Sequence, residues 1–141
     1  MSDTPGEGVG APLRLEPLPV RTEADAVAAF AREIGTQASR VPFTFPIRWL
    51  AHPEIRAAAA RIMGESGWIP LHESQSFDYR SALVVDADYR MQVEMRREAR
   101  PPRLVVRSAV AAPDGGLCLT METILRIVAP DGNEALDLPR Q

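Results

Sequence analysis

The sequence predicts an α+β fold in which two helices precede a long antiparallel sheet. Apolar residues recur with helical spacing in two stretches before residue 64, and with a period of two from residue 71 onward. The alternating stretches near the C-terminus are each about eleven residues long, well above the usual strand. Each has one apolar and one polar face, which is typical of an antiparallel sheet covered on one side by a helix.

The length and composition indicate one globular domain. The chain has 141 residues, of which 45% are hydrophobic and 25% are charged, values that suit a single domain with its own core. We expect a disordered tail over residues 1–12, a single domain over residues 13–130 and a polar C-terminal tail over residues 131–141. Pro17 and Pro19 restrict the start of the domain to an edge strand at most.

The first helix is expected after Thr22, whose side chain can cap it, with Asp25 at the capping-box position. The stretch from Val27 to Ile34 carries one apolar stripe at helical spacing. Gly35 suits the left-handed residue that ends such a helix.

The second helix is expected to begin at Pro53, a residue that favours the first helical turn, and to run to Met63. Gly64 follows and ends it. The helix contains four consecutive alanines, Ala57–Ala60, which allow its backbone to lie close to a sheet.

The rest of the chain alternates as strands do. Apolar residues from Tyr89 to Met95 face one side, and the pattern resumes after the break at Pro101-Pro102. Pro113–Gly116 predicts a hairpin turn before the last strand, Leu117–Ile127. A curved antiparallel sheet that wraps around one Ala-rich helix is the hotdog fold, and we predict that architecture.

Several chemistries are excluded by composition. The 16 basic residues are all arginine, so the lysines of P-loops, protein kinases and Schiff-base enzymes have no counterpart. The net charge of −3 argues against nucleic-acid binding. Cys118 has no second cysteine to pair with, and no zinc-ligand spacing occurs, so we expect no metal and no cofactor. No apolar run approaches a membrane span and no signal peptide is evident, so we expect a cytoplasmic protein without membrane contact.

Three segments resemble the MaoC-like hydratases and dehydratases, in particular the FAS1-like (N-terminal MaoC) dehydratase domain. They are FAREIG at Phe30–Gly35, VPFTFPIRWLAHPE at Val41–Glu54 and LHESQSFDYRSAL at Leu71–Leu83. The resemblance implies a hotdog domain that handles (3R)-hydroxyacyl and enoyl thioesters of coenzyme A (CoA) or of an acyl carrier protein (ACP). It also implies pairing, as a homodimer or as a heterodimer with a catalytic MaoC-like chain.

Catalytic members of that family carry D-x-N-x-x-H at the segment that corresponds to Gly35–Arg40, and this sequence has no Asp, Asn or His there. The departure favours a degenerate, non-catalytic subunit that shapes the acyl pocket. The alternative is an active dehydratase or acyl thioesterase that uses other acid–base residues.

The candidate residues for that alternative are His72, Asp78 and Glu54. Strict alternation would place His72 and Asp78 on one face of a strand and Glu73 on the other. The competing interpretation makes His72 a structural hydrogen-bonding residue. Glu54 has a rival role too, since a glutamate in the first turn stabilises a helix by itself.

Arginines cluster around the Pro101-Pro102 turn, and Arg96, Arg97 and Arg103 are the candidates for binding the phosphates of CoA or an acidic carrier protein. The alternative is a solvated sheet face, because Glu94 and Glu98 lie close enough in sequence to be cross-strand partners.

Overall fold

Six strands form one antiparallel sheet in the order β1-β4-β5-β6-β3, and β2 also pairs with β4. The computed structural model describes residues 11–37, 39–64 and 69–129, so most of the two expected tails lies outside the described residues. The elements are β1 Leu13–Arg14, β2 Leu18–Arg21, α1 Ala24–Ile34, the 3-10 helix η1 Phe45–Ala51, α2 Pro53–Met63, β3 Ile69–Tyr79, β4 Asp88–Ala99, β5 Pro102–Ala111 and β6 Leu117–Val128.

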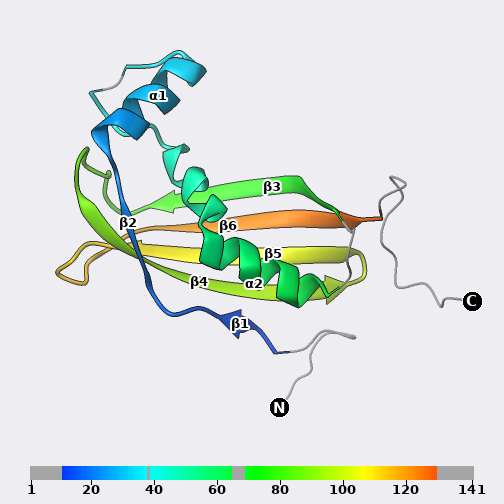
Figure 1. The fold of residues 1–141 in the computed structure, drawn as a ribbon. Coiled ribbons are helices and arrows are strands. Elements are labelled where there is room, and N and C mark those ends of the chain that lie inside the picture. Colours follow the sequence, from blue (N-terminus) through cyan, green and yellow to red (C-terminus); the bar gives the residue numbers. More distant parts are fainter. Residues whose placement is uncertain (1–10, 38, 65–68, 130–141) are drawn as a thin grey trace, which may run out of the picture.

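The helix α2 lies across one face of the sheet, and α1 lies beyond one end of it (Figure 1). Strands β1 and β2 flank β4 at one edge, as the prolines in this segment predicted, while β3 forms the other edge. The predicted α+β hotdog architecture is therefore confirmed. We call the face that α2 covers the inner face of the sheet, and the opposite side the outer face.

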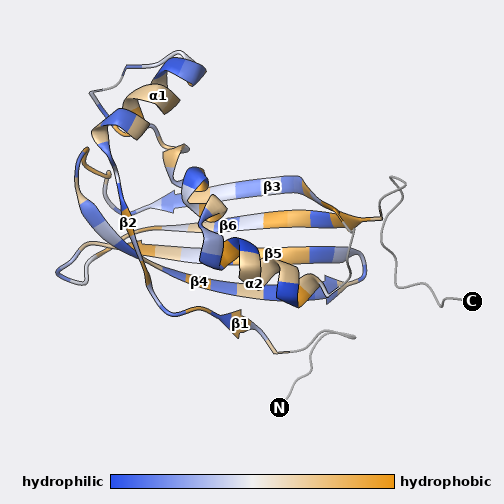
Figure 2. Cartoon of the chain, in the orientation of Figure 1, coloured by the Kyte–Doolittle hydropathy of each residue, from blue (hydrophilic) through white to orange (hydrophobic). Residues whose placement is uncertain are grey.

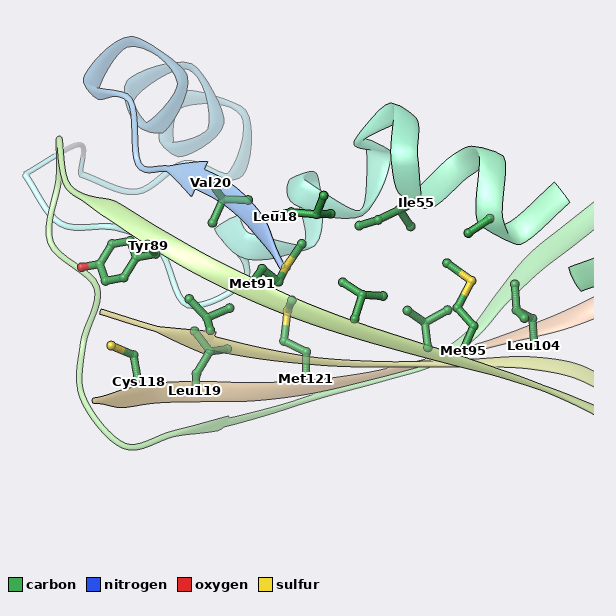
Figure 3. Close-up of a cluster of buried hydrophobic side chains, with 14 of the residues drawn as sticks. Leu18, Val20, Ile55, Tyr89, Met91, Met95, Leu104, Cys118, Leu119 and Met121 are labelled. Atoms are coloured by element: carbon green, nitrogen blue, oxygen red, sulfur yellow. The ribbon is translucent and has the colours of Figure 1, made fainter. Parts of the chain in front are cut away.

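The bounds of α2 agree with the sequence prediction, from Pro53 at its start to Gly64, which ends it with a φ of 77°. The side of the helix that faces the sheet carries Ile55 and Ala58, which are 4% and 0% exposed. Met91, Met95 and Leu104 point from the sheet toward α2 (Figure 3). Because an alanine is the contact residue, the helix packs close to these larger side chains.

The long central strands also follow their predicted alternation. Along β4, Tyr89, Met91, Val93 and Met95 are all less than 9% exposed, and the residues between them are more accessible. Figure 2 shows the corresponding alternation of hydrophobic and hydrophilic residues along β4 and β5. The predicted hairpin is present, with Gly115 at a φ of 95° and its N–H donating to the carbonyl of Ala112.

The helix α1 ends at Gly35, which has a φ of 76°, as predicted. It packs through Phe30 on Phe45 of η1 with the rings edge to face and their centroids 5.6 Å apart. The Arg48 guanidinium donates to the carbonyl of Ala26 at 3.3 Å, which adds a second link between the two elements.

The predicted capping role of Thr22 and Asp25 is wrong. The N-cap residue is Glu23, and its side chain makes no capping hydrogen bond. Instead, Asp86 accepts from the N–H of Ala24 at 2.9 Å, so the cap comes from a loop 62 residues away. Thr22 is fully buried, and its hydroxyl bonds to the carbonyl of Val84 and to the N–H of Ala87. It therefore ties β2 to this loop.

Replacing Thr22 by valine should destabilise the fold by about 1–3 kcal/mol, because the isostere leaves buried backbone groups of the 84–87 loop without partners. Urea unfolding followed by circular dichroism measures the change. Thr36→Val is the matched control, since Thr36 is exposed and contributes no side-chain hydrogen bond among those described. Equal stability of the two variants would contradict a structural role for the Thr22 hydroxyl.

Candidate functional site

A mainly apolar pocket of about 320 Å³ lies between the η1–α2 segment and the inner face of the sheet. Its volume is at the lower end of the range for small-molecule sites, about 300–1,000 Å³. His72 and Thr123 are its polar strand residues, and Arg56 adds a charged group. The apolar lining includes Ile47, Leu50, Ala59, Met95, Leu104 and Leu125.

A β-bulge in β3 determines which residues of that strand face the pocket. His72 pairs with Leu125 of β6, but Ser74 pairs with Ile124, so Glu73 is an extra residue between them. Gln75 then pairs with Thr123, and Phe77 with Met121, both on the inner face. His72 consequently lies on the same face as Gln75, despite their odd spacing.

The prediction that His72 shares a face with Asp78 is therefore wrong. Asp78 pairs with Thr120, and it lies with Ser76 on the outer face. The error arises because strict alternation was carried through a strand that contains one extra residue. Instead of Asp78, Gln75 and Thr123 lie on the face of the sheet that carries His72, and the sequence pattern had indicated neither of them.

Thr123 and Gln75 form a polar pair beside the apolar pocket wall. The Thr123 hydroxyl donates to Oε1 of Gln75 at 2.6 Å, and Thr123 is only 3% exposed. The Gln75 amide also donates to the carbonyl of Ser76 at 3.3 Å. Because the hydroxyl hydrogen is used in this bond, the Thr123 oxygen can act only as an acceptor toward a further partner.

Glu54 does not line the same pocket as His72. It lines a separate cavity of about 530 Å³ between α2 and the β1–β2 segment, together with His52 and Arg61. The Nδ1 atom of His52 accepts from the N–H of Glu54 at 3.0 Å, so His52 is the side-chain cap of α2. The structural role considered for Glu54, as a glutamate in the first turn of a helix, agrees with this arrangement.

Of the three candidate arginines, Arg96 and Arg103 lie together on the outer face, whereas Arg97 is separate from them. Arg97 lies at the end of α2, where its guanidinium donates to the carbonyl of Met63 at 2.9 Å. Arg96 and Arg103 share a carboxylate: they lie 2.8 Å and 3.8 Å from Glu98, and Arg103 also lies 3.3 Å from Glu73. These contacts fit the alternative interpretation of a solvated, ion-paired sheet face.

Glu73 is the carboxylate that joins three strands on the outer face. Its Oε1 lies 3.1 Å from Nε of Arg126 on β6, and its Oε2 lies 3.3 Å from Nη2 of Arg103 on β5. The hydrogen bond from Arg126, with the charge of both arginines, holds the pKa of Glu73 below its ordinary value of 4.5, although partial desolvation acts the other way.

A lowered pKa in the folded state makes the contribution of Glu73 to stability pH-dependent. This contribution should be complete above pH 4.5 and should disappear as the pH falls through the lower folded-state value. We therefore expect Glu73→Gln to be less stable than the unmodified chain at neutral pH, with a difference that shrinks well below pH 4.5. Urea midpoints at several pH values measure this, and a difference independent of pH would contradict it.

The segment Gly35–Arg40, where the resemblance predicted a catalytic motif, contains no Asp, Glu or His. Thr36, Gln37 and Arg40 line a third, open hollow of about 510 Å³ with Phe43. Nearby, the Tyr79 hydroxyl donates to the carbonyl of Phe43 at 2.6 Å. Burial raises the pKa of Tyr79 to about 12, so this phenol stays protonated near neutral pH.

Within the described ranges the chain has neither a candidate metal-binding cluster nor a membrane-spanning helix. No group of three or more His, Cys, Asp and Glu side chains could hold a metal ion there. None of the helices in the same residues is both long enough and apolar enough to span a membrane.

Comparison with solved structures places the chain among hotdog proteins. It superposes on the HadBC (3R)-hydroxyacyl-ACP dehydratase complex of Mycobacterium tuberculosis with a TM-score of 0.61 and 16% identity, over 81% of this chain and 93% of that one. A hot-dog-like protein from Thermanaerovibrio acidaminovorans superposes with a TM-score of 0.60 and 15% identity, over 88% of this chain and 85% of that one. A 1,4-dihydroxy-2-naphthoyl-CoA thioesterase from Synechocystis superposes with a TM-score of 0.59 and 14% identity, over 87% of this chain and 88% of that one.

No protein-family profile and no curated protein sequence matches the chain. The likeness is therefore one of fold: the chain is a hotdog-fold protein, as its topology and central helix indicate.

Proposed function

We propose that this protein binds the acyl part of a pantetheine thioester in the pocket lined by His72. The observation that carries the proposal is the pocket itself, an apolar cavity beneath α2 with an imidazole and a threonine hydroxyl on its strand wall. Apolar walls suit a hydrocarbon chain, and a few polar groups suit a thioester carbonyl. The dehydratase and the thioesterase among the similar structures act on ligands of this class, which supports the proposal.

In this proposal the protein is a non-catalytic MaoC-like subunit. The segment Gly35–Arg40 lacks the Asp, Asn and His of the family motif, and Asp78 lies on the face of β3 opposite His72. A second hotdog chain would then supply the acid–base pair, while this chain shapes the acyl pocket.

The edge strand β3 is the surface proposed for that second subunit. It is 11 residues long and largely exposed, including the apolar side chains of Ile69 and Leu71, which are 43% and 51% exposed. A long edge strand of this kind presents unpaired backbone groups that another strand can bond to. Pairing there would extend the sheet into the partner.

Native mass spectrometry of the untagged complex, isolated from the source organism, tests the assembly. Co-isolation of a hotdog chain with the D-x-N-x-x-H motif is the expected result. A complex that contains only copies of this chain would overturn the pocket-shaping role. Calorimetric titration of the same complex with hexanoyl-CoA, with free CoA as control, tests whether the acyl chain is recognised.

A second candidate function is acyl-thioester turnover at His72, because this imidazole lines the pocket where a thioester would lie. As a general base, His72 would remove a proton from water as the water attacks the thioester carbonyl, and the departing thiolate would then take up that proton. Turnover of hexanoyl-CoA by the isolated chain, lost in His72→Ala with the fold intact, would favour this function. Absence of turnover, or equal turnover in the variant, would exclude it.

A further inference from the structure

The extra residue in the bulge of β3 determines whether His72 or Glu73 faces the pocket. In the observed register, Leu71 pairs with Arg126, His72 with Leu125 and Ser74 with Ile124. If the first part of β3 moved one residue along β6, the bulge would disappear. Glu73 would then pair with Leu125 and His72 with Arg126. Because a shift of one residue exchanges the two faces of a strand, Glu73 would enter the pocket and His72 would leave it.

The remainder of β3 cannot absorb the shift as easily. Phe77 and Tyr79 are partly buried against the hydrophobic core, and the Tyr79 hydroxyl is bonded to the carbonyl of Phe43. Moving this half of the strand by one residue would turn both rings to the outer face. The choice between the two registers therefore concerns residues 69–73.

Glu73 favours the bulged register through its charge. On the outer face it has the two arginine partners already described, one from β5 and one from β6. In the alternative register its carboxylate would lie beside Leu125 and Leu104, which line the pocket. An ionised carboxylate is strongly disfavoured in such surroundings unless it is paired.

From this geometry we propose that Glu73 is a positioning residue whose ion pairs with Arg126 and Arg103 hold the β-bulge and thereby keep His72 facing the pocket. The consequence for ligand binding rests on the function proposed above, whereas the consequence for the side-chain arrangement does not. Bulges commonly re-aim a side chain at functional sites, and here the re-aimed side chain is the imidazole of the pocket.

The test uses the contact between His72 and Leu125 in the full chain. Only two histidines exist, His52 and His72, so each imidazole signal can be assigned by a single His→Gln substitution. Nuclear Overhauser effects between the His72 imidazole and the Leu125 methyl groups are expected in the unmodified chain. In Glu73→Leu they should disappear, since the introduced leucine is better placed in the pocket than a carboxylate.

Two further variants separate register from charge. Deletion of Glu73 removes the extra residue and leaves His72 opposite Leu125, so the Overhauser effects should persist although the carboxylate is gone. Glu122→Gln is the control, because Glu122 also binds an arginine on the outer face, Arg107 at 2.9 Å, but lies outside the bulge. It should leave the His72 signals unchanged.

Persistence of the His72–Leu125 contact in Glu73→Leu would overturn the proposal. If that variant does not fold, Glu73→Gln decides, because an amide has the same size without the charge. The contact should then weaken, and an unchanged contact would overturn the inference. Titration of the same samples with hexanoyl-CoA keeps the two proposals distinct. A lost contact in a chain that never binds the thioester would remove the proposed function and leave the positioning role intact.

Discussion

Replacing Ala58 by leucine is expected to destabilise the fold by about 1–3 kcal/mol, because overpacked cores shift side chains and backbone. Ala58 is 0% exposed on the side of α2 that faces the sheet. Met91, Met95 and Leu104, each 0% exposed, fill the space on the sheet side. Three added carbon atoms at this contact would push α2 away from β4 and β5.

Ala57→Leu is the matched control for this prediction. Ala57 belongs to the same helix and the same run of alanines, but its side chain is exposed. Leucine is also a good helix former, so the control should unfold at nearly the original urea concentration. Equal destabilisation by both substitutions would show that α2 is sensitive to bulk everywhere and that close packing at Ala58 is not the reason.

The architecture could be predicted because local signals and core packing agree. Pro53, the alanine run and Gly64 marked α2 within the residues that form it. The alternation from Tyr89 to Met95 marked a strand with one buried face. In each case the residues that favour the element locally are also those that it buries or ends with.

The start of α1 was predicted less well because its cap comes from a distant loop. A threonine before a helix is a common cap, yet Thr22 is drawn into the interior by bonds to residues 84–87. Asp86 then supplies the acceptor for Ala24. No spacing rule within one helix can reveal a partner 62 residues away.

The pocket face of β3 was mispredicted for a different reason. A bulge interrupts the period of two without a glycine or proline to mark it. One signal was present all the same. Counting back in steps of two from Tyr79 and Phe77 through Gln75 reaches Glu73, a charged residue at a position that strict alternation assigns to the core face. That conflict between pattern and chemistry indicates an irregular strand.

Replacing Ala59 by leucine should weaken ligand binding without destabilising the fold, whereas Ala58→Leu should destabilise the fold. Ala59 lines the pocket that contains His72, so a leucine there fills space that the acyl chain would occupy. We expect the affinity for hexanoyl-CoA to fall at least about tenfold, a loss of about 1.4 kcal/mol of binding free energy. Stability should stay the same or rise slightly, since the added carbons fill a cavity.

Ala60→Leu serves as the control for Ala59→Leu, because Ala60 is the next residue of α2 and is exposed. Calorimetric titration with hexanoyl-CoA and urea unfolding of both variants give the two quantities needed. Unchanged affinity in Ala59→Leu would place the acyl chain elsewhere, for example in the separate cavity beside Glu54. Loss of affinity with retained stability in Ala59→Leu, but not in Ala60→Leu, would place the acyl chain between α2 and the strands that carry His72 and Thr123, because only Ala59 of these two residues lines that pocket.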